Sequence, residues 1–233
     1  MQQLFKSLCM IFSLCALLSF AYASTITVNP LFASLTFKKR YQDIQVQNAE
    51  SGKGDTAYVS ISIYRVNHPG MPDQSFTKLD DNPYKIGLIV TPNKMVIPSG
   101  QMRIARVLYI GKPVDADVLY EVKFTPVSGN LVAIGQDKTN IAAGVELVIA
   151  YGVGILVRPV DLNPNVTAVR DGKKVTLSNT GNTTVSIGHC TPDKYFFVRL
   201  YPGNVKHVTL KTDSAQTCKQ EILQNQVSKF EIK

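Results

Sequence analysis

The most regular hydrophobic pattern of the chain lies in residues 144–159, which read GVELVIAYGVGILVRP. Every second residue from Val145 to Val157 is apolar, apart from the tyrosine at 151. Because a β-strand turns alternate side chains to opposite faces, this segment predicts a long strand with one apolar face. Two interpretations follow from the pattern alone. The strand either lies in the core of a β-sandwich or offers part of its apolar face to another chain.

Upstream of this segment, period-two alternation predicts strands and no helix. Pro30 interrupts the first stretch, which indicates an edge strand or a switch between sheets. Segments 43–47 and 58–64 flank a polar turn and are expected to form a hairpin. The proline-rich segment 68–83 is expected to be irregular. Further strands are expected at 26–28, 31–37, 103–110 and 118–124, with two short ones within 87–98.

Alternation resumes after Arg158-Pro159 and a short linker at 161–164. The pair Asp171-Gly172 is a strong hairpin signal. The strands expected in this part are 166–169, 175–177, 185–187, 196–200, 205–210, 221–223 and 227–232. The sequence therefore predicts an all-β protein of two immunoglobulin-like β-sandwich domains, with boundaries at 24–158 and 159–233.

Residues 1–23 have the features of a cleavable secretory signal peptide. Lys6 supplies a positive charge, residues 8–20 are apolar, and Ala21-Tyr22-Ala23 matches the small-residue cleavage pattern. The apolar run is shorter than the ~20 residues that a membrane span needs. We therefore expect cleavage after Ala23 and export of the mature protein.

Cleavage would leave two of the four cysteines, Cys190 and Cys218. In an oxidising compartment such a pair is expected to form a disulfide. A metal site using His189 with both cysteines lacks paired ligand spacing, so we expect no metal. The other histidines, His68 and His207, accompany no hydrolase, metalloprotease or phosphate-binding motif. We expect no cofactor and no enzymatic activity, with an exported hydrolase using His189 or His207 as a remote alternative.

The formal net charge of the chain is +8. Its basic residues are scattered, and the longest basic run, residues 38–40, reads as a solvated turn rather than a nucleic-acid site. The YGVG segment at 151–154 is too short for a dinucleotide-binding loop, and its glycines are expected to permit close backbone approach. The Asn-X-Thr triplets at 165–167 and 182–184 are assigned no role.

Three stretches taken in order resemble the periplasmic chaperones of the chaperone–usher pilus pathway, closest to the alternate, class 5 branch. These stretches are 90–107, 118–124 and the strand that ends at Arg158-Pro159. The resemblance implies a boomerang of two sandwiches in the periplasm whose cleft binds a pilus subunit lacking its last strand. Such chaperones donate a strand to this partner and deliver it to an outer-membrane usher. Strand addition gives affinity through main-chain bonds and specificity through alternate side chains.

Counting back from Arg158, the resemblance places the donated residues at Val145, Leu147 and Ile149, with Tyr151 beside them. It also implies an interdomain salt bridge from Arg158 to Asp117 and Asp213. The best-known branch anchors the terminal carboxylate of the subunit with a lysine and an arginine, but the matching positions here are Gly154 and Phe32. The region of Gly152 and Gly154 is thus the expected anchoring place, with the basic group left open.

Another function fits the same pattern. A secreted two-domain β-sandwich adhesin or surface-binding module would act alone and need no donor strand. The sequence also leaves open whether the free protein self-associates through its exposed strand, as edge strands tend to do.

Overall fold

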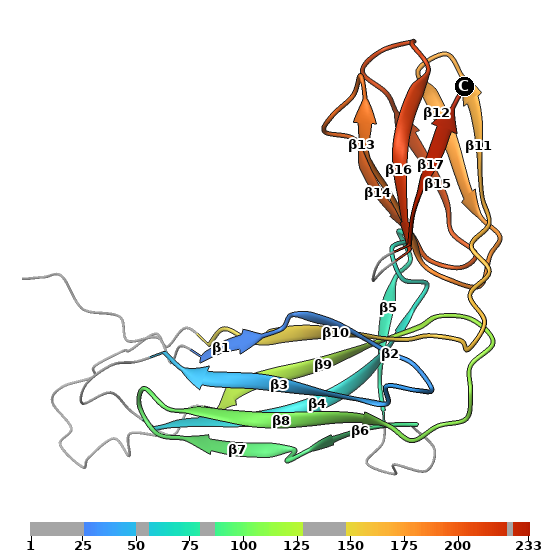
Figure 1. The fold of residues 1–233 in the computed structure, drawn as a ribbon. Coiled ribbons are helices and arrows are strands. Elements are labelled where there is room, and N and C mark those ends of the chain that lie inside the picture. Colours follow the sequence, from blue (N-terminus) through green and yellow to red (C-terminus); the bar gives the residue numbers. More distant parts are fainter. Residues whose placement is uncertain (1–25, 50–55, 80–86, 128–147, 223–225) are drawn as a thin grey trace, which may run out of the picture.

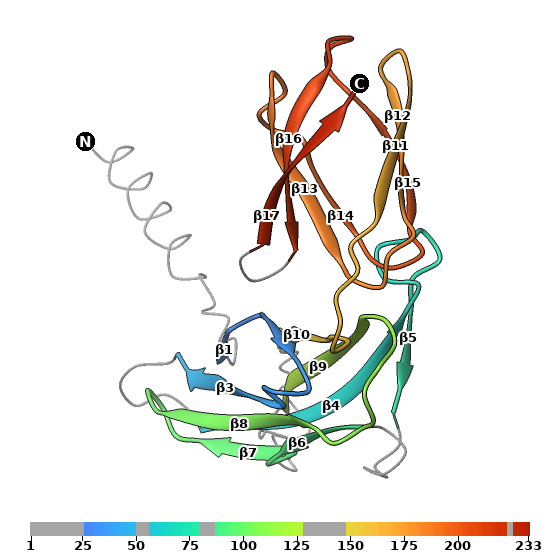
Figure 2. The same ribbon diagram turned by 45° about the vertical axis from the view of Figure 1, so that its right-hand side comes forward.

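A computed structural model describes residues 26–49, 56–79, 87–127, 148–222 and 226–233. The expected signal peptide and the predicted donor residues Val145 and Leu147 lie outside these ranges. Every regular element described is a β-strand, and the strands form two sandwiches set at an angle to one another (Figures 1 and 2). None of the described segments is a helix long and apolar enough to cross a membrane. The all-β, two-sandwich class expected from the sequence is confirmed.

The first sandwich contains a four-stranded and a six-stranded sheet. The four-stranded sheet has the order β1 (Ile26–Asn29), β3 (Tyr41–Asn48), β8 (Met102–Tyr109) and β6 (Leu88–Thr91). The six-stranded sheet has the order β2 (Phe32–Leu35), β10 (Tyr151–Val157), β9 (Val118–Val127), β4 (Ala57–Asn67) and β5 (Ser75–Lys78), with β7 (Lys94–Ile97) also paired to β4.

Alternate residues of both sheets fill the core between them. Ile44 and Val46 of β3 face Val122 and Phe124 of β9, and all four side chains are fully buried. Burying each such side chain contributes on the order of 1.5–3 kcal/mol. The period-two pattern read from the sequence therefore identifies the core faces of the strands correctly.

Two expectations about strand pairing are wrong. Segments 43–47 and 58–64 do not form a hairpin, because β3 pairs with β1 and β8 while β4 belongs to the opposite sheet. Alternation shows which side of a strand is buried but not which strand lies beside it. The segment expected to be irregular also contains β5, which forms by pairing with the last residues of β4.

Pro30 marks a switch between the two sheets. The strand before it, β1, pairs with β3 in one sheet, and the strand after it, β2, pairs with β10 in the other. Because β2 begins only at Phe32, it runs beside β10 for part of the length of β10.

The second sandwich contains a three-stranded and a four-stranded sheet. The three-stranded sheet has the order β11 (Val166–Asp171), β12 (Lys174–Asn179) and β15 (Val205–Thr209). The four-stranded sheet has the order β14 (Phe197–Leu200), β13 (Val185–Thr191), β16 (Gln216–Ile222) and β17 (Gln226–Ile232).

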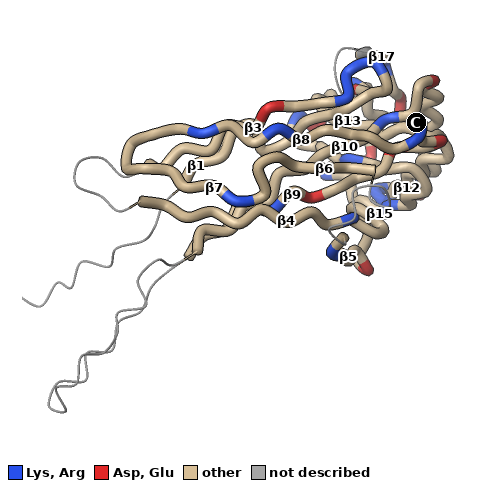
Figure 3. The backbone as a smooth tube through the Cα atoms, turned by 90° about the horizontal axis from the view of Figure 1, so that it is seen from below, with Lys and Arg blue, Asp and Glu red and all other residues tan. Residues whose placement is uncertain are grey.

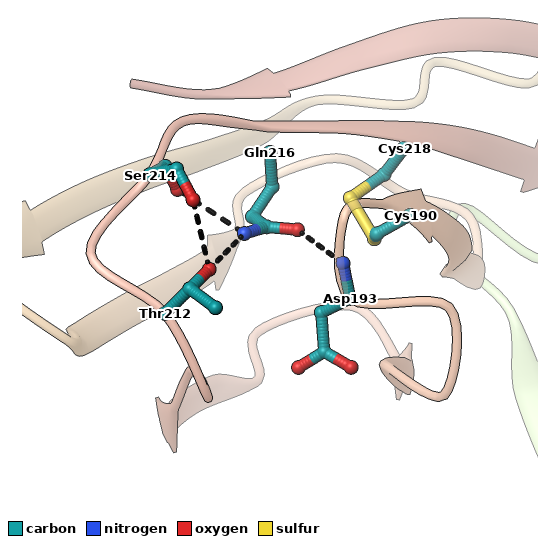
Figure 4. The surroundings of a disulfide bond; sticks show 6 residues. All are labelled: Cys190, Asp193, Thr212, Ser214, Gln216 and Cys218. Atoms are coloured by element: carbon teal, nitrogen blue, oxygen red, sulfur yellow. Dashed lines mark hydrogen bonds between the residues drawn. A yellow bond between two sulfur atoms is a disulfide. The ribbon is translucent and has the colours of Figure 1, made fainter.

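The predicted disulfide between Cys190 and Cys218 is present and joins β13 to β16 (Figure 4). Beside it, the buried Gln216 side chain accepts a hydrogen bond from the Asp193 N–H at 3.0 Å and donates one to the Thr212 hydroxyl at 3.1 Å. With these contacts β16 starts at Gln216, five residues before the strand 221–223 that was expected from hydrophobicity. The pattern missed it because polar side chains, rather than apolar ones, hold this end of the strand.

The charged residues are spread over both sandwiches. In the tube view the lysines and arginines occur along strands of each domain and are interspersed with acidic residues (Figure 3). This distribution agrees with the scattered charges of the sequence.

Candidate functional site

Strand β10 has strand partners on both sides for only part of its length. It is antiparallel to β9 from the Tyr151–Phe124 pair to the Val157–Val118 pair. On its other side, β2 runs parallel to it only from Gly154 onward. Within the described ranges, no strand pairs with that second edge between Tyr151 and Val153. An edge of this kind can accept another strand.

The side chains of β10 continue the apolar alternation up to this open edge. Val153, Ile155 and Val157 are buried in the core of the first sandwich, and Tyr151 packs against the same core. Ile149, the next residue of the same parity, is 44% exposed and precedes the strand. It is thus an exposed apolar residue next to the open edge, and it is the last of the three residues that the resemblance assigned to the donated strand.

Side chains from neighbouring strands cover both glycines of the predicted anchoring region. A Cβ atom on Gly154 would lie 2.7 Å from Cδ2 of Phe32, and one on Gly152 would lie 2.9 Å from Cδ of Glu121. Real Cβ atoms do not approach other atoms so closely, so a side chain at position 154 would displace the Phe32 ring, whereas one at position 152 would only move the end of the flexible Glu121 side chain. The surface of this region is therefore formed by Phe32 and Glu121 and not by open backbone.

A basic residue of the second sandwich reaches this region. The guanidinium carbon of Arg199, on β14, lies 5.3 Å from the ring centroid of Phe32, a cation–π distance. The Nε of Arg199 also donates a hydrogen bond to the Ser186 hydroxyl at 3.4 Å. In the part of the chain that the structure describes, no carboxylate forms an ion pair with Arg199. No sequence signal marked this residue, because the contact joins positions in different domains.

Arg158 and Asp117 meet at the junction of the two sandwiches. Nε of Arg158 lies 3.5 Å from Oδ1 of Asp117, and their side chains are 4% and 0% exposed. The backbone N–H of Arg158 donates to the Leu35 carbonyl at 2.9 Å, which fixes the end of β10 beside β2. The structure thus brings together the two residues that the resemblance paired.

The triplet Asn182-Thr183-Thr184, to which the sequence assigned no role, completes this junction from the second sandwich. The Asp117 carboxylate accepts hydrogen bonds from the Thr184 N–H at 2.6 Å and the Thr183 hydroxyl at 3.2 Å. Nη2 of Arg158 donates to the same hydroxyl at 2.5 Å. The Asn182 amide donates to the carbonyls of Asp115 at 3.2 Å and Asp161 at 2.9 Å.

Asp213, the other predicted partner of Arg158, lies elsewhere. It is exposed in the connection between β15 and β16, next to residues that surround the disulfide. The junction is at the start of β13, whereas the disulfide is at the end of that strand. The structure therefore places Asp213 and Arg158 at opposite ends of the second sandwich.

The three histidines do not form a common site. His68 pairs with Asp73 at 2.6 Å in the first sandwich, His207 contacts the Thr176 hydroxyl at 3.0 Å in the second, and His189 is an exposed residue of β13. Within the described segments, no group of three or more histidine, cysteine, aspartate or glutamate side chains could hold a metal ion.

Two curated fimbrial proteins of Escherichia coli match this chain. One, a subunit of CS1 fimbriae, is 25% identical over 134 residues, which are 57% of this chain and 55% of that protein. The other, a subunit of CFA/I fimbriae, is 24% identical over 174 residues, 71% of this chain and 72% of that protein. The chain thus spans little more than half the length of the first of these relatives. No protein-family model matches it.

Solved structures match nearly the whole molecule. The class 5 fimbriae chaperone CfaA superposes with a TM-score of 0.62 at 18% identity, covering 89% of this chain and 98% of that one. This chain has the fold of the fimbrial chaperones. The E. coli chaperone DraB also gives a TM-score of 0.62, at 13% identity and with 92% and 98% covered. A third match is a chain in the structure of the Salmonella enterica SafA pilin in complex with the SafB chaperone. Its TM-score is 0.57 at 13% identity, and the match covers 92% of this chain and 98% of that one.

Proposed function

We propose that this protein is a periplasmic chaperone that binds pilus subunits by donor-strand complementation and delivers them to an outer-membrane usher. A subunit that lacks one strand exposes an apolar groove, and the chaperone fills that groove with a strand of its own. The activity is binding and needs no catalytic step.

The half-paired strand β10 carries this proposal. Its backbone edge between Tyr151 and Val153 can pair with a strand of the subunit, since β2 covers that edge only from Gly154 onward. Ile149 then continues the apolar face of β10 beyond the core of the chaperone, and Leu147 and Val145 follow with the same parity. Insertion of three such side chains contributes on the order of 1.5–3 kcal/mol each.

The comparisons support a chaperone more than an adhesin that acts alone. The matches extend over 98% of the CfaA and DraB chains, and both of those proteins are chaperones. The matched SafA–SafB structure is a complex of a pilin with a chaperone.

Two neighbouring residues allow a matched test. Ile149 and Val148 are 44% and 41% exposed, but they have opposite parity. Ile149→Glu should lower the recovery of a subunit complex from periplasmic extracts at least about tenfold, because losing one buried apolar side chain removes more than about 1.4 kcal/mol. Val148→Glu should leave the recovery unchanged. Mass spectrometry identifies the co-purified protein, and circular dichroism checks the folding of both variants.

Equal recovery with the two variants would contradict donor-strand binding. Ligand binding by the purified protein without any co-purified subunit would favour the adhesin.

Within this function, we assign the basic group of the anchoring region to Arg199. A strand added along the open edge of β10 must end or turn away where β2 begins, at Phe32. Arg199 lies over that residue, and within the described ranges it has no carboxylate partner. A guanidinium forms its strongest hydrogen bonds with a carboxylate. The carboxylate at the end of an added chain would thus accept the hydrogen bonds that Arg199 can donate.

Arg199→Glu should weaken the subunit complex by at least about tenfold, as expected for the loss of a charge-assisted contact. Lys211→Glu makes the same charge change at an exposed position of the second sandwich and should have no effect. Adding two glycines to the carboxyl end of the co-purified subunit moves its terminal carboxylate. This change should weaken the complex if Arg199 binds that carboxylate and leave it unchanged if Arg199 binds an acidic side chain. If Arg199→Glu and Lys211→Glu behave alike, the assignment fails while the donor-strand proposal stands.

A further inference from the structure

The two sandwiches touch at a second place, separate from the linker that follows Arg158. The turn between β4 and β5, residues 68–74, lies against the base of the second sandwich in both ribbon views (Figures 1 and 2). A Cβ atom on Gly70 would lie 3.3 Å from atoms of Tyr201, Asn204 and Lys206. The turn therefore contacts the connection between β14 and β15 and the start of β15, so closely that a side chain at position 70 would have to displace the side chains that it meets.

Internal hydrogen bonds hold this turn in shape. The N–H groups of Met71 and Gln74 donate to the carbonyls of His68 and Met71, both at 3.1 Å. The Gln74 side chain accepts from the Gly70 N–H at 2.7 Å, and His68 pairs with Asp73 at 2.6 Å. Gly70 has a φ of +73°, a conformation that favours glycine. The turn has a defined geometry of its own.

The opposite surface is equally well defined. The Tyr201 N–H donates to the Asn204 side chain at 3.0 Å, and the Asn204 carbonyl accepts from the Asn179 N–H at 2.9 Å. The Asn179 side chain is buried and donates to the carbonyls of Thr183 at 2.9 Å and Leu200 at 3.0 Å. Asn179 therefore connects the surface under the turn to Thr183, which binds Asp117 and Arg158.

We propose that the turn 68–74 is a brace that holds the second sandwich at a fixed angle to the first. Two domains joined by a linker alone move relative to each other by default, through a few residues that absorb the rotation. Here the junction beside the linker and the surface under the turn are connected by hydrogen bonds of Asn179. Its side chain bonds the Thr183 carbonyl at the junction, and its N–H bonds the Asn204 carbonyl under the turn. Rotation about the linker would break the contact at Gly70. The inference concerns the free protein and does not depend on the proposed function.

The test is a measurement of the distance between the two domains. Spin labels on cysteines at Gln45 and Lys194, both exposed, report the angle by pulsed electron resonance with the native disulfide intact. Gly70→Asn adds a side chain at the brace, and asparagine tolerates a positive φ. Gly172→Asn is the matched control, because Gly172 has a φ of +56° and would place a Cβ with nothing within 4 Å.

The unsubstituted protein and Gly172→Asn should give one narrow distance distribution, and Gly70→Asn should shift it or widen it at least twofold. Asp73→Ala loosens the exposed turn without crowding it and should also widen the distribution. The brace is rejected if both Gly70→Asn and Asp73→Ala match the control. If Gly70→Asn does not fold, Asp73→Ala alone decides.

Discussion

Asp117 in the first sandwich accepts a hydrogen bond from the backbone N–H of Thr184 in the second, at 2.6 Å. The carboxylate of Asp117 also lies beside the guanidinium of Arg158, and both side chains are buried. A small, buried polar network thus joins the two sandwiches.

Replacing Asp117 by alanine should destabilise the protein by about 3 kcal/mol, because breaking one partner of a buried ion pair leaves a poorly compensated charge. Urea unfolding followed by circular dichroism measures the change. Asp115→Ala is the control, since Asp115 is exposed and contributes its carbonyl, not its side chain, to the junction. A change of less than about 1 kcal/mol for Asp117→Ala would show that the network adds little to stability.

Two adjacent threonines at the junction should respond in opposite ways to the same isosteric change. The Thr183 hydroxyl bonds both Arg158 and Asp117, so Thr183→Val should cost about 1–3 kcal/mol. The Thr184 hydroxyl is buried and has no protein partner within the described segments, so Thr184→Val should be neutral or stabilising by up to about 1 kcal/mol. Thermal unfolding of the two variants checks this. A larger loss for Thr184→Val would contradict the assigned bonds.

Removing the disulfide should weaken the second sandwich. The bridge closes a separation of 28 residues and joins two buried cysteines. Changing Cys190 and Cys218 to alanine should lower stability by about 2–4 kcal/mol, mainly because the unfolded chain gains freedom. Calorimetry with and without a reducing agent measures the effect. The reductant should lower the melting temperature of the native protein and not that of the double variant. An equal decrease in both would show that the effect of the reductant does not come from the bridge.

The pKa of Asp43 should lie below the ordinary value for aspartate. Arg106 donates hydrogen bonds to both of its carboxylate oxygens, at 2.7 and 2.8 Å, and these bonds are the main cause of the lowered pKa, ahead of the opposing effect of burial. A lowered folded-state pKa means that the contribution to stability is present above the unfolded pKa. It is lost as the pH falls through the folded pKa. Carbon NMR of the side chain measures the titration.

Arg106→Gln should return the pKa of Asp43 toward its ordinary range and remove this acid-dependent part of the stability. An unchanged titration in that variant would show that another group lowers the pKa.

Alternation along the sequence determined the fold class and the faces of the strands. The parity of Val153, Ile155 and Val157 placed them in the core because a strand has only two faces and one of them is buried. The same pattern singled out the strand that contains β10, and the resemblance, counted back from Arg158, added Ile149 as a donor residue. The disulfide was predicted because only two cysteines follow the segment 1–23, which is expected to be a signal peptide.

Only the tertiary structure decided which strands are neighbours and which side chains meet across domains. The place where β2 joins β10, and hence where the open edge ends, depends on long-range pairing. Arg199 meets Phe32, and Asp117 meets Thr184, over long stretches of sequence. Asp213 was assigned to the junction by resemblance, but it lies in the connection between β15 and β16, near the disulfide at the opposite end of β13 from the junction. Periodicity reports local burial, whereas such contacts depend on how separate elements are placed in space.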